Sequence, residues 1–306
     1  MKYLKKIVKI ITIPIKLFQH ISLLKTQEYK ATFELEGNIK LNLPKSGFLS
    51  ILTKSGRNQI FKAFMFTDRP QAEPLLRKIV YGLFLSRYLN CEKSIIDIGC
   101  WIGDNSLVWA KMLKNGGSVY AIEGIYESFR FASKMASINE INNVHFTNAI
   151  CADVPNLSVV SGGSQGGTYF KQSDLKSRFK TTTIDEVIPL DCHGNIGLFH
   201  IDVEGFEEKV ILGAMRVIKS SRPIIIFEQH ISSENARIII NLLESMKYKI
   251  FMVNEVIPGN RIDCRNFIAF DATKPLPNVA NNDNSKGSEN NIWYATLGPS
   301  LLEIES

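Results

Sequence analysis

The feature that most constrains the fold of this 306-residue chain is an alternation of short apolar runs with longer amphipathic segments, which starts at Ser94. Strands separated by helix-length crossovers form right-handed βαβ units and a parallel sheet. In chain order, the predicted strands are Ile95–Ile98, Val119–Ile122, Val144–Ile150, Leu198–Val203 and Pro223–Glu228, and the predicted helices are Asn105–Leu113, Glu127–Ile138, Glu207–Val217 and Glu234–Met246.

Two later apolar runs predict that the sheet is not parallel throughout. Lys249–Val253 and Asn266–Phe270 lie too close together in the chain for a crossover helix, so we expect them to pair antiparallel. Upstream of the sheet, Tyr29–Leu43 alternates apolar and polar residues about Gly37 and predicts a β-hairpin. Glu73–Leu89 has helical periodicity and should pack beside the first strand.

Two segments break this pattern. The Gly- and Ser-rich stretch Ser161–Thr168 predicts a flexible loop, and we expect it to close over a bound ligand and exclude water. Residues 276–306 include an Asn- and Ser-rich stretch, which predicts a flexible C-terminal tail.

The N-terminus is strongly basic. The first thirty residues carry seven lysines and one acid, in a chain of net charge +6. Residues 1–26 have the apolar spacing of an amphipathic helix, but no charge-free run reaches the length of a membrane span. One hypothesis is that residues 1–24 lie on the anionic inner face of a membrane; the other is that the helix packs on the protein itself.

The charge pattern and the cysteine content indicate which partners and which cellular compartment to expect. Basic residues are not interleaved with aromatic residues along one element, so no nucleic-acid partner is expected. The five cysteines form no CxxC pair, which indicates neither a zinc site nor a disulfide framework. A reduced, cytoplasmic location is therefore expected.

The first two predicted strands end in residues suited to a nucleoside-containing ligand. In open parallel sheets, ligands bind outside the carboxyl ends of the strands. Asp97, Gly99 and Gly103 follow the first strand, where glycines allow close approach of a ligand and the next helix offers free N–H groups. Glu123 ends the second strand and can accept hydrogen bonds from both ribose hydroxyls. The turn lacks the middle glycine of GxGxxG, which favours S-adenosylmethionine over NAD.

The following strands add polar residues at the same edge. Asn148, near the end of the third strand, or Asp153, just after it, is expected to meet the adenine amino group. By the alternation of a strand, His200, Asp202 and Glu204 are expected to share one face at the end of the fourth strand. Burial of an ionisable group costs free energy unless the group is paired or takes part in binding or catalysis. These three residues therefore predict a reactive site at the end of the fourth strand.

The fifth strand brings Glu228 and His230 to the same opening. Asp202, Glu228 or His230 is expected to act as the base that takes the proton from an acceptor hydroxyl. Alternatively, Asp202 and Glu228 could hold a divalent metal such as Mg²⁺, which would lower the pKa of that hydroxyl.

Several stretches of the chain resemble the FkbM family of methyltransferases in order and rough spacing. The stretches are IIDIGCWIGDNSLVWA, VYAIEG, TTTIDEV, HIDVEGFEEKVILGA and RPIIIFEQH. The resemblance implies a class I S-adenosylmethionine-dependent methyltransferase: an α/β, Rossmann-like, mostly parallel sheet whose last strand is antiparallel, with helices on both faces. It also implies O-methylation, with sugars or polyketide hydroxyls as typical acceptors.

The resemblance assigns roles by position. Asp97, Gly99 and Gly103 match the donor loop of the family, and Glu123 matches its ribose acid. Asp202, Glu204 and Gly205 match the motif after the fourth strand, and Glu228 matches the fifth-strand acid. Thr183 and Asp185 match a Thr-Leu-Asp segment of the family. This chain departs from the family at His200, where lysine is common, and at Cys100 and Trp101, where small residues are common.

The sequence thus predicts four parts: the helix 1–26, a hairpin-and-helix extension 27–90, a methyltransferase domain 91–275 and the tail 276–306. The predicted function is transfer of a methyl group from S-adenosylmethionine to a hydroxyl of a glycan or a glycosylated, lipid-linked small molecule. The alternatives are an NAD-dependent oxidoreductase and a non-catalytic binding protein with a methyltransferase fold.

Overall fold

A computed structural model describes residues 31–35, 39–43, 74–164, 167–172, 179–230, 233–253, 264–277 and 301–304. The predicted helix 1–26 lies outside these residues, as does most of the predicted tail. The predicted hairpin is confirmed: β1 (Ala31–Leu35) pairs antiparallel with β2 (Ile39–Leu43). None of the described helices is both long and apolar enough to cross a bilayer.

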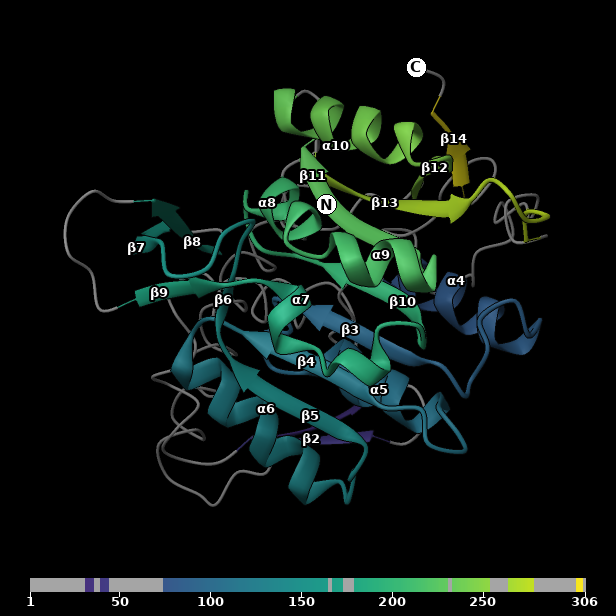
Figure 1. Ribbon diagram of the computed structural model, residues 1–306. Coiled ribbons are helices and arrows are strands. Elements are labelled where there is room, and N and C mark those ends of the chain that lie inside the picture. The colour runs from purple at the N-terminus through teal and green to yellow at the C-terminus, as the bar shows by residue number, and fades with distance from the viewer. Residues whose placement is uncertain are drawn as a thin grey trace, which may run out of the picture.

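The main sheet has eight strands in the order β14-β12-β13-β11-β10-β3-β4-β5 (Figure 1). The strands are β3 (Ser94–Ile98), β4 (Val119–Glu123), β5 (Val144–Asn148), β10 (Ile196–Ile201), β11 (Ile224–His230), β12 (Tyr248–Val253), β13 (Cys264–Asp271) and β14 (Leu301–Glu303). The strands β5, β4, β3, β10 and β11 pair parallel, whereas β13 pairs antiparallel with both β11 and β12. The predicted sheet, mostly parallel with an antiparallel strand near its end, is confirmed.

The strand order reverses between β3 and β10. The chain runs outward from β3 through β4 to β5 and then returns to place β10 on the other side of β3. A reversal of this kind leaves a crevice at the carboxyl ends of the two central strands, where open α/β sheets bind their ligands. The carboxyl ends of β3 and β10 are therefore the expected centre of the site.

Helices cover both faces of the sheet. They are α4 (Pro74–Leu85), α5 (Asp104–Met112), α6 (Tyr126–Ile138), α7 (Ile184–Val187), α8 (Glu207–Leu212), α9 (Met215–Ser221) and α10 (Glu234–Ser245). Alternate strand residues face opposite sides: Ile95 packs in the cluster that includes α4, α5 and α6, and Ile96 in the cluster that includes α7 to α10. Each face of the sheet thus has its own apolar core.

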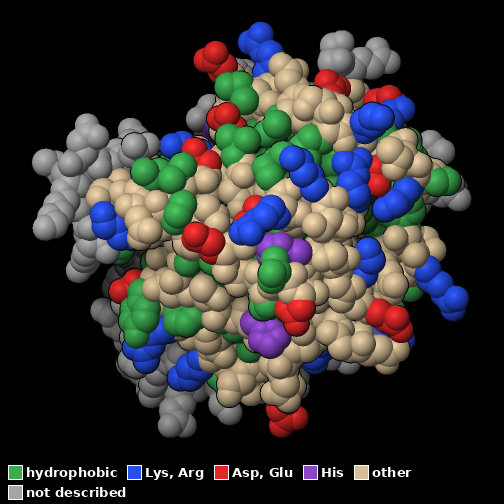
Figure 2. Space-filling view, viewed as in Figure 1, with side chains coloured by type: hydrophobic (Ala, Val, Ile, Leu, Met, Phe, Trp, Pro, Cys, Tyr) green, Lys and Arg blue, Asp and Glu red, His purple; other side chains and the backbone are tan. Residues whose placement is uncertain are grey.

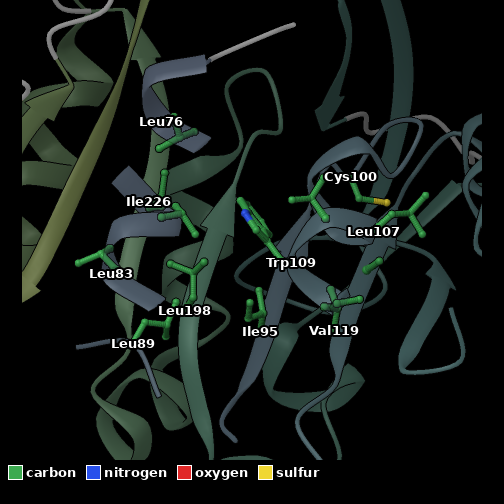
Figure 3. Packing of buried hydrophobic residues seen from close by; sticks show 14 of the residues in the cluster. Leu76, Leu83, Leu89, Ile95, Cys100, Leu107, Trp109, Val119, Leu198 and Ile226 are labelled. Atoms are coloured by element: carbon green, nitrogen blue, oxygen red, sulfur yellow. The ribbon is translucent and has the colours of Figure 1, made fainter. Parts of the chain in front are cut away.

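Trp109 of α5 is a centre of the first core (Figure 3). Its side chain is buried and lies among Leu76 and Leu83 of α4 and Leu198 and Ile226 of the sheet. Burial of large apolar side chains supplies most of the free energy that holds such layers together. This packing fixes α4 beside α5, the helix that follows the glycine-containing turn.

Basic side chains gather over α9 on the opposite face (Figure 2). The exposed basic residues of α9 are Arg216 and Lys219. Part of this charge is paired, because the Arg216 guanidinium lies 3.4 Å from the Asp185 carboxylate. This face therefore has mixed rather than uniformly basic charge.

A second, four-stranded sheet replaces the flexible loop that the sequence predicts. Its order is β6-β9-β7-β8, formed by β6 (Ile150–Cys151), β7 (Ser158–Ser164), β8 (Gly167–Gln172) and β9 (Phe179–Thr182). The loop prediction for Ser161–Thr168 is wrong for its described residues, because residues 161–164 pair antiparallel with residues 167–170. Val, Tyr and Phe residues flank the glycines and favour strands, and this outweighs the local turn composition.

The predicted third strand is divided for the same reason. The chain leaves the main sheet at Ala149, and β6 then pairs parallel with β9. The base of the second sheet is apolar: Ile150, Ala152 and Val159 cluster with Phe206, which follows β10. This apolar cluster joins the small sheet to the loop after β10.

The sequence predicts a single helix, Glu207–Val217, after the strand that is now β10. The structure has two helices there, α8 and α9. Gly213 separates them and lies so close to Ala152 that a Cβ would be 2.0 Å from its carbonyl oxygen. The Asp185 carboxylate accepts hydrogen bonds from the backbone N–H groups of Arg216 and Val217, each at 3.0 Å. A distant aspartate therefore caps the second helix, which local periodicity does not reveal.

Candidate active site

The turn between β3 and α5 has a backbone that only certain residues adopt easily. Gly99 and Gly103 have φ angles of 76° and 78°, in the left-handed region. A Cβ on Gly99 would lie 1.7 Å from the carbonyl oxygen of Asp202, so no larger residue fits there. Trp101 also lies in this region, at φ 47°, which is costly for a bulky residue. The turn is thus pressed against the loop after β10 and carries backbone strain.

Glu123 holds this turn from the end of β4. Its buried carboxylate accepts hydrogen bonds from the backbone N–H groups of Trp101 at 2.9 Å and Ile125 at 2.7 Å. Burial raises the pKa of Glu123 to about 7, although these hydrogen bonds oppose the rise. Each carboxylate oxygen has a second lone pair, so Glu123 can both fix the turn and accept from ribose hydroxyls.

Asp97 is buried beneath the turn and is fully engaged. Its Oδ2 accepts a hydrogen bond from the Ser106 hydroxyl, and its Oδ1 lies 2.8 Å from Nδ1 of His200. The His200 ring packs edge-on against Trp109, with 5.3 Å between ring centroids. Asp97 therefore links β3, α5 and β10, and His200 supplies the buried nitrogen partner that the carboxylate needs.

The two candidates for adenine recognition differ in their surroundings. Asn148 lies opposite Glu123 in register, and its amide nitrogen donates to the carbonyls of Glu123 at 2.7 Å and Gly124 at 3.2 Å. Asp153 instead has a buried Oδ1 with no hydrogen-bond partner within the described part of the chain. A buried acceptor without a donor is costly, and an exocyclic amino group is a donor that would satisfy it. Adenine recognition by Asp153 stays a prediction, and the unpartnered acceptor favours Asp153 over Asn148 for it.

Three carboxylates lie at the ends of β10 and β11. The strand β10 ends at Ile201, so the predicted alternation through Glu204 is wrong; Glu204 has a left-handed φ of 52° in the following turn. Glu204 is exposed, but partial desolvation of its carboxyl, together with the negative charges of Glu228 and Glu207, raises its pKa to about 7. Desolvation and the carboxylates of Glu228, Asp202 and Glu204 raise the pKa of Cys264, so these groups act on one another.

Glu228 and His230 end β11 as predicted. Glu228 accepts a hydrogen bond from the Cys264 thiol, with 2.7 Å between sulfur and oxygen. His230 lies opposite Cys264 in register, two residues along the strand from Glu228 and so on the same face. No group of three His, Cys, Asp or Glu side chains in the described residues is arranged to hold a metal ion. Metal binding by Asp202 and Glu228 stays a prediction.

Glu207 is a residue of the site that the sequence interpretation missed. It is 1% exposed, and its carboxylate accepts hydrogen bonds from the Gly205 N–H at 3.0 Å and the Gln229 side chain at 2.5 Å. Ser233 donates in turn to Gln229 and accepts from Ala236, at the start of α10. This network fixes the loop that carries Asp202 and Glu204 to β11. An acid just after a glycine at a helix start is the local signal for such a role.

These features define the class of the protein. The strand order, the antiparallel β13, and the glycine turn with an acid at the end of the next strand are those of a class I, Rossmann-like methyltransferase. The family model described as the methyltransferase FkbM domain matches residues 97–250, half of the chain. The chain belongs to this family. It is an S-adenosylmethionine-dependent methyltransferase, and neither alternative considered from the sequence is supported.

Solved methyltransferases are similar to this chain at low identity. The FkbM methyltransferase from Methylobacillus flagellatus KT is 15% identical with a TM-score of 0.41; the match covers 58% of this chain and 44% of that one. An O-methyltransferase from Bacillus cereus in complex with SAH is 14% identical with a TM-score of 0.42, covering 74% and 90%. A putative O-methyltransferase from Klebsiella pneumoniae is 13% identical with a TM-score of 0.39, covering 66% and 92%. No curated protein matches the chain.

Proposed function

We propose that this methyltransferase transfers the methyl group to a hydroxyl oxygen of a glycan or of a glycosylated, lipid-linked small molecule. The observation that carries the proposal is the group of carboxylates at the ends of β10 and β11, with the pKa of Glu204 raised to about 7. A carboxylate of that pKa is matched to taking a proton near neutral pH. The family resemblance, with sugar and polyketide hydroxyls as typical acceptors, supports an oxygen nucleophile.

The donor supplies an electrophilic methyl group when it is bound. The residues of this chain then have two tasks. The glycine turn and Glu123 orient one reactant, and the loop Asp202–Gly205 orients the other; holding two reactants in line accounts for much of the rate of such transfers. A carboxylate oxygen takes the hydroxyl proton as the new carbon–oxygen bond forms and the carbon–sulfur bond breaks, so charge and atoms balance.

The structure allows the candidate bases to be ranked. Asp202, Glu228 and His230 were expected from the sequence, and the raised pKa of Glu204 adds a fourth candidate. One oxygen of Glu228 already accepts the Cys264 thiol, which leaves it less available than Glu204. We propose Glu204 as the first base to test, with Asp202 and Glu228 holding the acceptor hydroxyl.

The proposed acceptor class is tested by methyl transfer to a matched panel. Purified protein and S-adenosylmethionine are incubated with simple glycosides, a lipid-linked glycoside, amines and carboxylic acids, and S-adenosylhomocysteine formation is measured. Methylation of glycosides supports the proposal, and methylation of amines alone refutes it. Glu204→Gln should lower kcat at least tenfold, whereas Glu208→Gln, four residues along the same segment, should leave it unchanged.

We also propose that the basic N-terminus brings the enzyme to the inner, cytoplasmic face of a membrane, where a lipid-linked acceptor would be found. The support is the density of lysines in residues 1–24, since each basic residue near an anionic surface contributes about 1 kcal/mol. Removal of residues 1–24 should abolish sedimentation with anionic vesicles and leave donor binding intact. Full retention on the vesicles would contradict this part of the proposal.

A further inference from the structure

The turn that carries Glu204 has a backbone conformation that must be held in place. Glu204 and Gly205 both have left-handed φ angles, 52° and 105°. A residue with a side chain adopts this region only at a cost in free energy, so contacts from outside the turn must hold Glu204 there. The start of the turn is tied to the end of β3, because the backbone N–H of Asp202 donates to the carbonyl of Ile98 at 2.9 Å. A second support is therefore expected next to Glu204 itself.

Glu207, the first residue of α8, supplies this second support. Its carboxylate accepts the backbone N–H groups on both sides of Glu204: that of Gly205 at 3.0 Å and, over a longer distance of 3.4 Å, that of Val203. Glu207 is 1% exposed, and burial raises its pKa while these N–H groups oppose the rise. Two hydrogen bonds that span one residue fix the path of the backbone at that residue. The direction in which the Glu204 side chain leaves the turn therefore depends on Glu207.

The position of the Glu207 carboxylate is set in turn by side chains of β11 and of the residue before α10. The Gln229 amide nitrogen donates to Oε2 of Glu207 at 2.5 Å. The Ser233 hydroxyl donates to the amide oxygen of Gln229 at 2.9 Å, which fixes the orientation of that amide. Ser233 also accepts from the backbone N–H of Ala236. These donors and acceptors alternate in one direction, from the start of α10 to the turn that carries Glu204.

The start of a helix does not need this arrangement. An acid in the first turn of a helix interacts favourably with the helix dipole at the surface, without being buried. Burial of a carboxylate costs free energy unless its hydrogen bonds offset the cost. The hydrogen bonds of Glu207 named above go to the turn and to β11, not to α8. The energy that keeps this acid buried is thus spent on holding the turn.

We propose that Glu207 is a positioning residue of the methyl transfer: it holds the turn that directs Glu204 toward the acceptor hydroxyl. This inference rests on the proposed function, in which Glu204 takes the proton of that hydroxyl. The donor is bound by the turn after β3 and by Glu123, and the bond between Asp202 and Ile98 does not involve Glu207. Loss of Glu207 should therefore slow the transfer step without weakening the donor site.

The first experiment reverses the polarity of the bond between Glu207 and Gln229. Glu207→Gln places two amides against each other, and kcat should fall roughly 10- to 100-fold, since a displacement of about 1 Å has an effect of that size in a preorganised site. Gln229→Glu places two carboxylates together and should be similarly slow. The double variant again pairs one amide with one carboxylate, so its kcat should return to within about threefold of wild type. Glu208→Gln, the neighbouring acid of α8, is the matched control and should keep the wild-type kcat.

A second variant asks whether Glu207 acts through Glu204. Adding Glu207→Gln to Glu204→Gln should lower kcat no further, because the group that Glu207 positions is already absent. A further fall of about tenfold would show that Glu207 acts independently of Glu204, and would overturn the positioning role. Each variant is also titrated with S-adenosylhomocysteine, and the Kd should stay within about twofold of wild type. A loss of donor affinity in Glu207→Gln that matches its loss of kcat would overturn the inference, because Glu207 would then support the fold of the whole site.

Amide hydrogen exchange tests the same inference without an acceptor. The backbone N–H groups of Val203 and Gly205 should exchange about tenfold faster in Glu207→Gln than in wild-type protein, and the double variant with Gln229→Glu should restore their protection. Unchanged exchange would overturn the inference whatever the acceptor. If exchange changes as expected but wild-type protein methylates no glycoside, the proposed function fails on its own and the hold of Glu207 on the turn is upheld.

Discussion

The ionisation of Glu123 should control donor binding near neutral pH. Burial raises the pKa of this carboxyl from its ordinary value of 4.5 to about 7. In the ionised form the carboxylate accepts hydrogen bonds from the N–H groups of Trp101 and Ile125 and has lone pairs left for ribose hydroxyls. Protonation turns one oxygen into a donor, which competes with both functions. The donor should therefore bind the ionised form.

The expected size of the effect follows from the pKa. Below pH 7 the ionised fraction falls about tenfold per pH unit, so the Kd for S-adenosylhomocysteine should be about tenfold weaker at pH 6 than at its plateau above pH 8. Stability of the ligand-free protein should change in the opposite direction. Because the folded pKa is raised, ionisation opposes folding, and about 3 kcal/mol of stability is lost as pH rises from about 4.5 through 7.

The assay is calorimetric titration with S-adenosylhomocysteine from pH 6 to pH 8.5, without an acceptor. Glu123→Gln should bind weakly and show no pH dependence over this range. Glu204→Gln is the matched control, because Glu204 has a similar pKa of about 7 but lies on the acceptor side and should leave the profile unchanged. A flat profile in wild-type protein, or one that disappears in Glu204→Gln, would refute the reasoning.

Three further predictions concern positions that support the site. Gly99→Ala should abolish or severely destabilise folding, because its Cβ would lie 1.7 Å from a carbonyl oxygen, whereas Gly194→Ala, with no atom within 4 Å, should be neutral in melting temperature. Equal effects would contradict the close approach. Asp185→Ala should cost about 1 kcal/mol in urea unfolding, through loss of a helix cap, without changing donor affinity. A change in affinity would show that Asp185 acts on the site. His200→Ala should cost about 2–3 kcal/mol by removing one of the two side-chain hydrogen-bond partners of the buried Asp97 carboxylate, and His200→Lys should restore part of this loss; no difference between the two variants would argue against the contact.

The sequence predicts the main sheet well, for physical reasons that are local. Strands such as β3 and β10 are buried on both sides and read as continuous apolar runs, and the helices between them keep their 3.6-residue period. The carboxyl edge follows from topology alone, so Asp97, Glu123 and Asp202 could be placed near one another before any contact was known.

The errors arise where distant segments decide local structure. The chain leaves the main sheet at Ala149 because β6 pairs with β9, about thirty residues away in the chain. Gly213 breaks a helix because it must pass close to Ala152. Glu207 looks like an ordinary charged residue of a helix, and only its hydrogen bond to Gln229 shows its role. Periodicity has no access to such contacts.

The most direct test of the donor assignment is calorimetric titration of the purified protein at pH 8 with S-adenosylhomocysteine and, separately, with NADH. The structure predicts one site with a Kd of about micromolar for S-adenosylhomocysteine and no heat of binding for NADH. Binding of NADH, or of neither ligand, would contradict the assignment of the turn after β3 and Glu123 as an S-adenosylmethionine site.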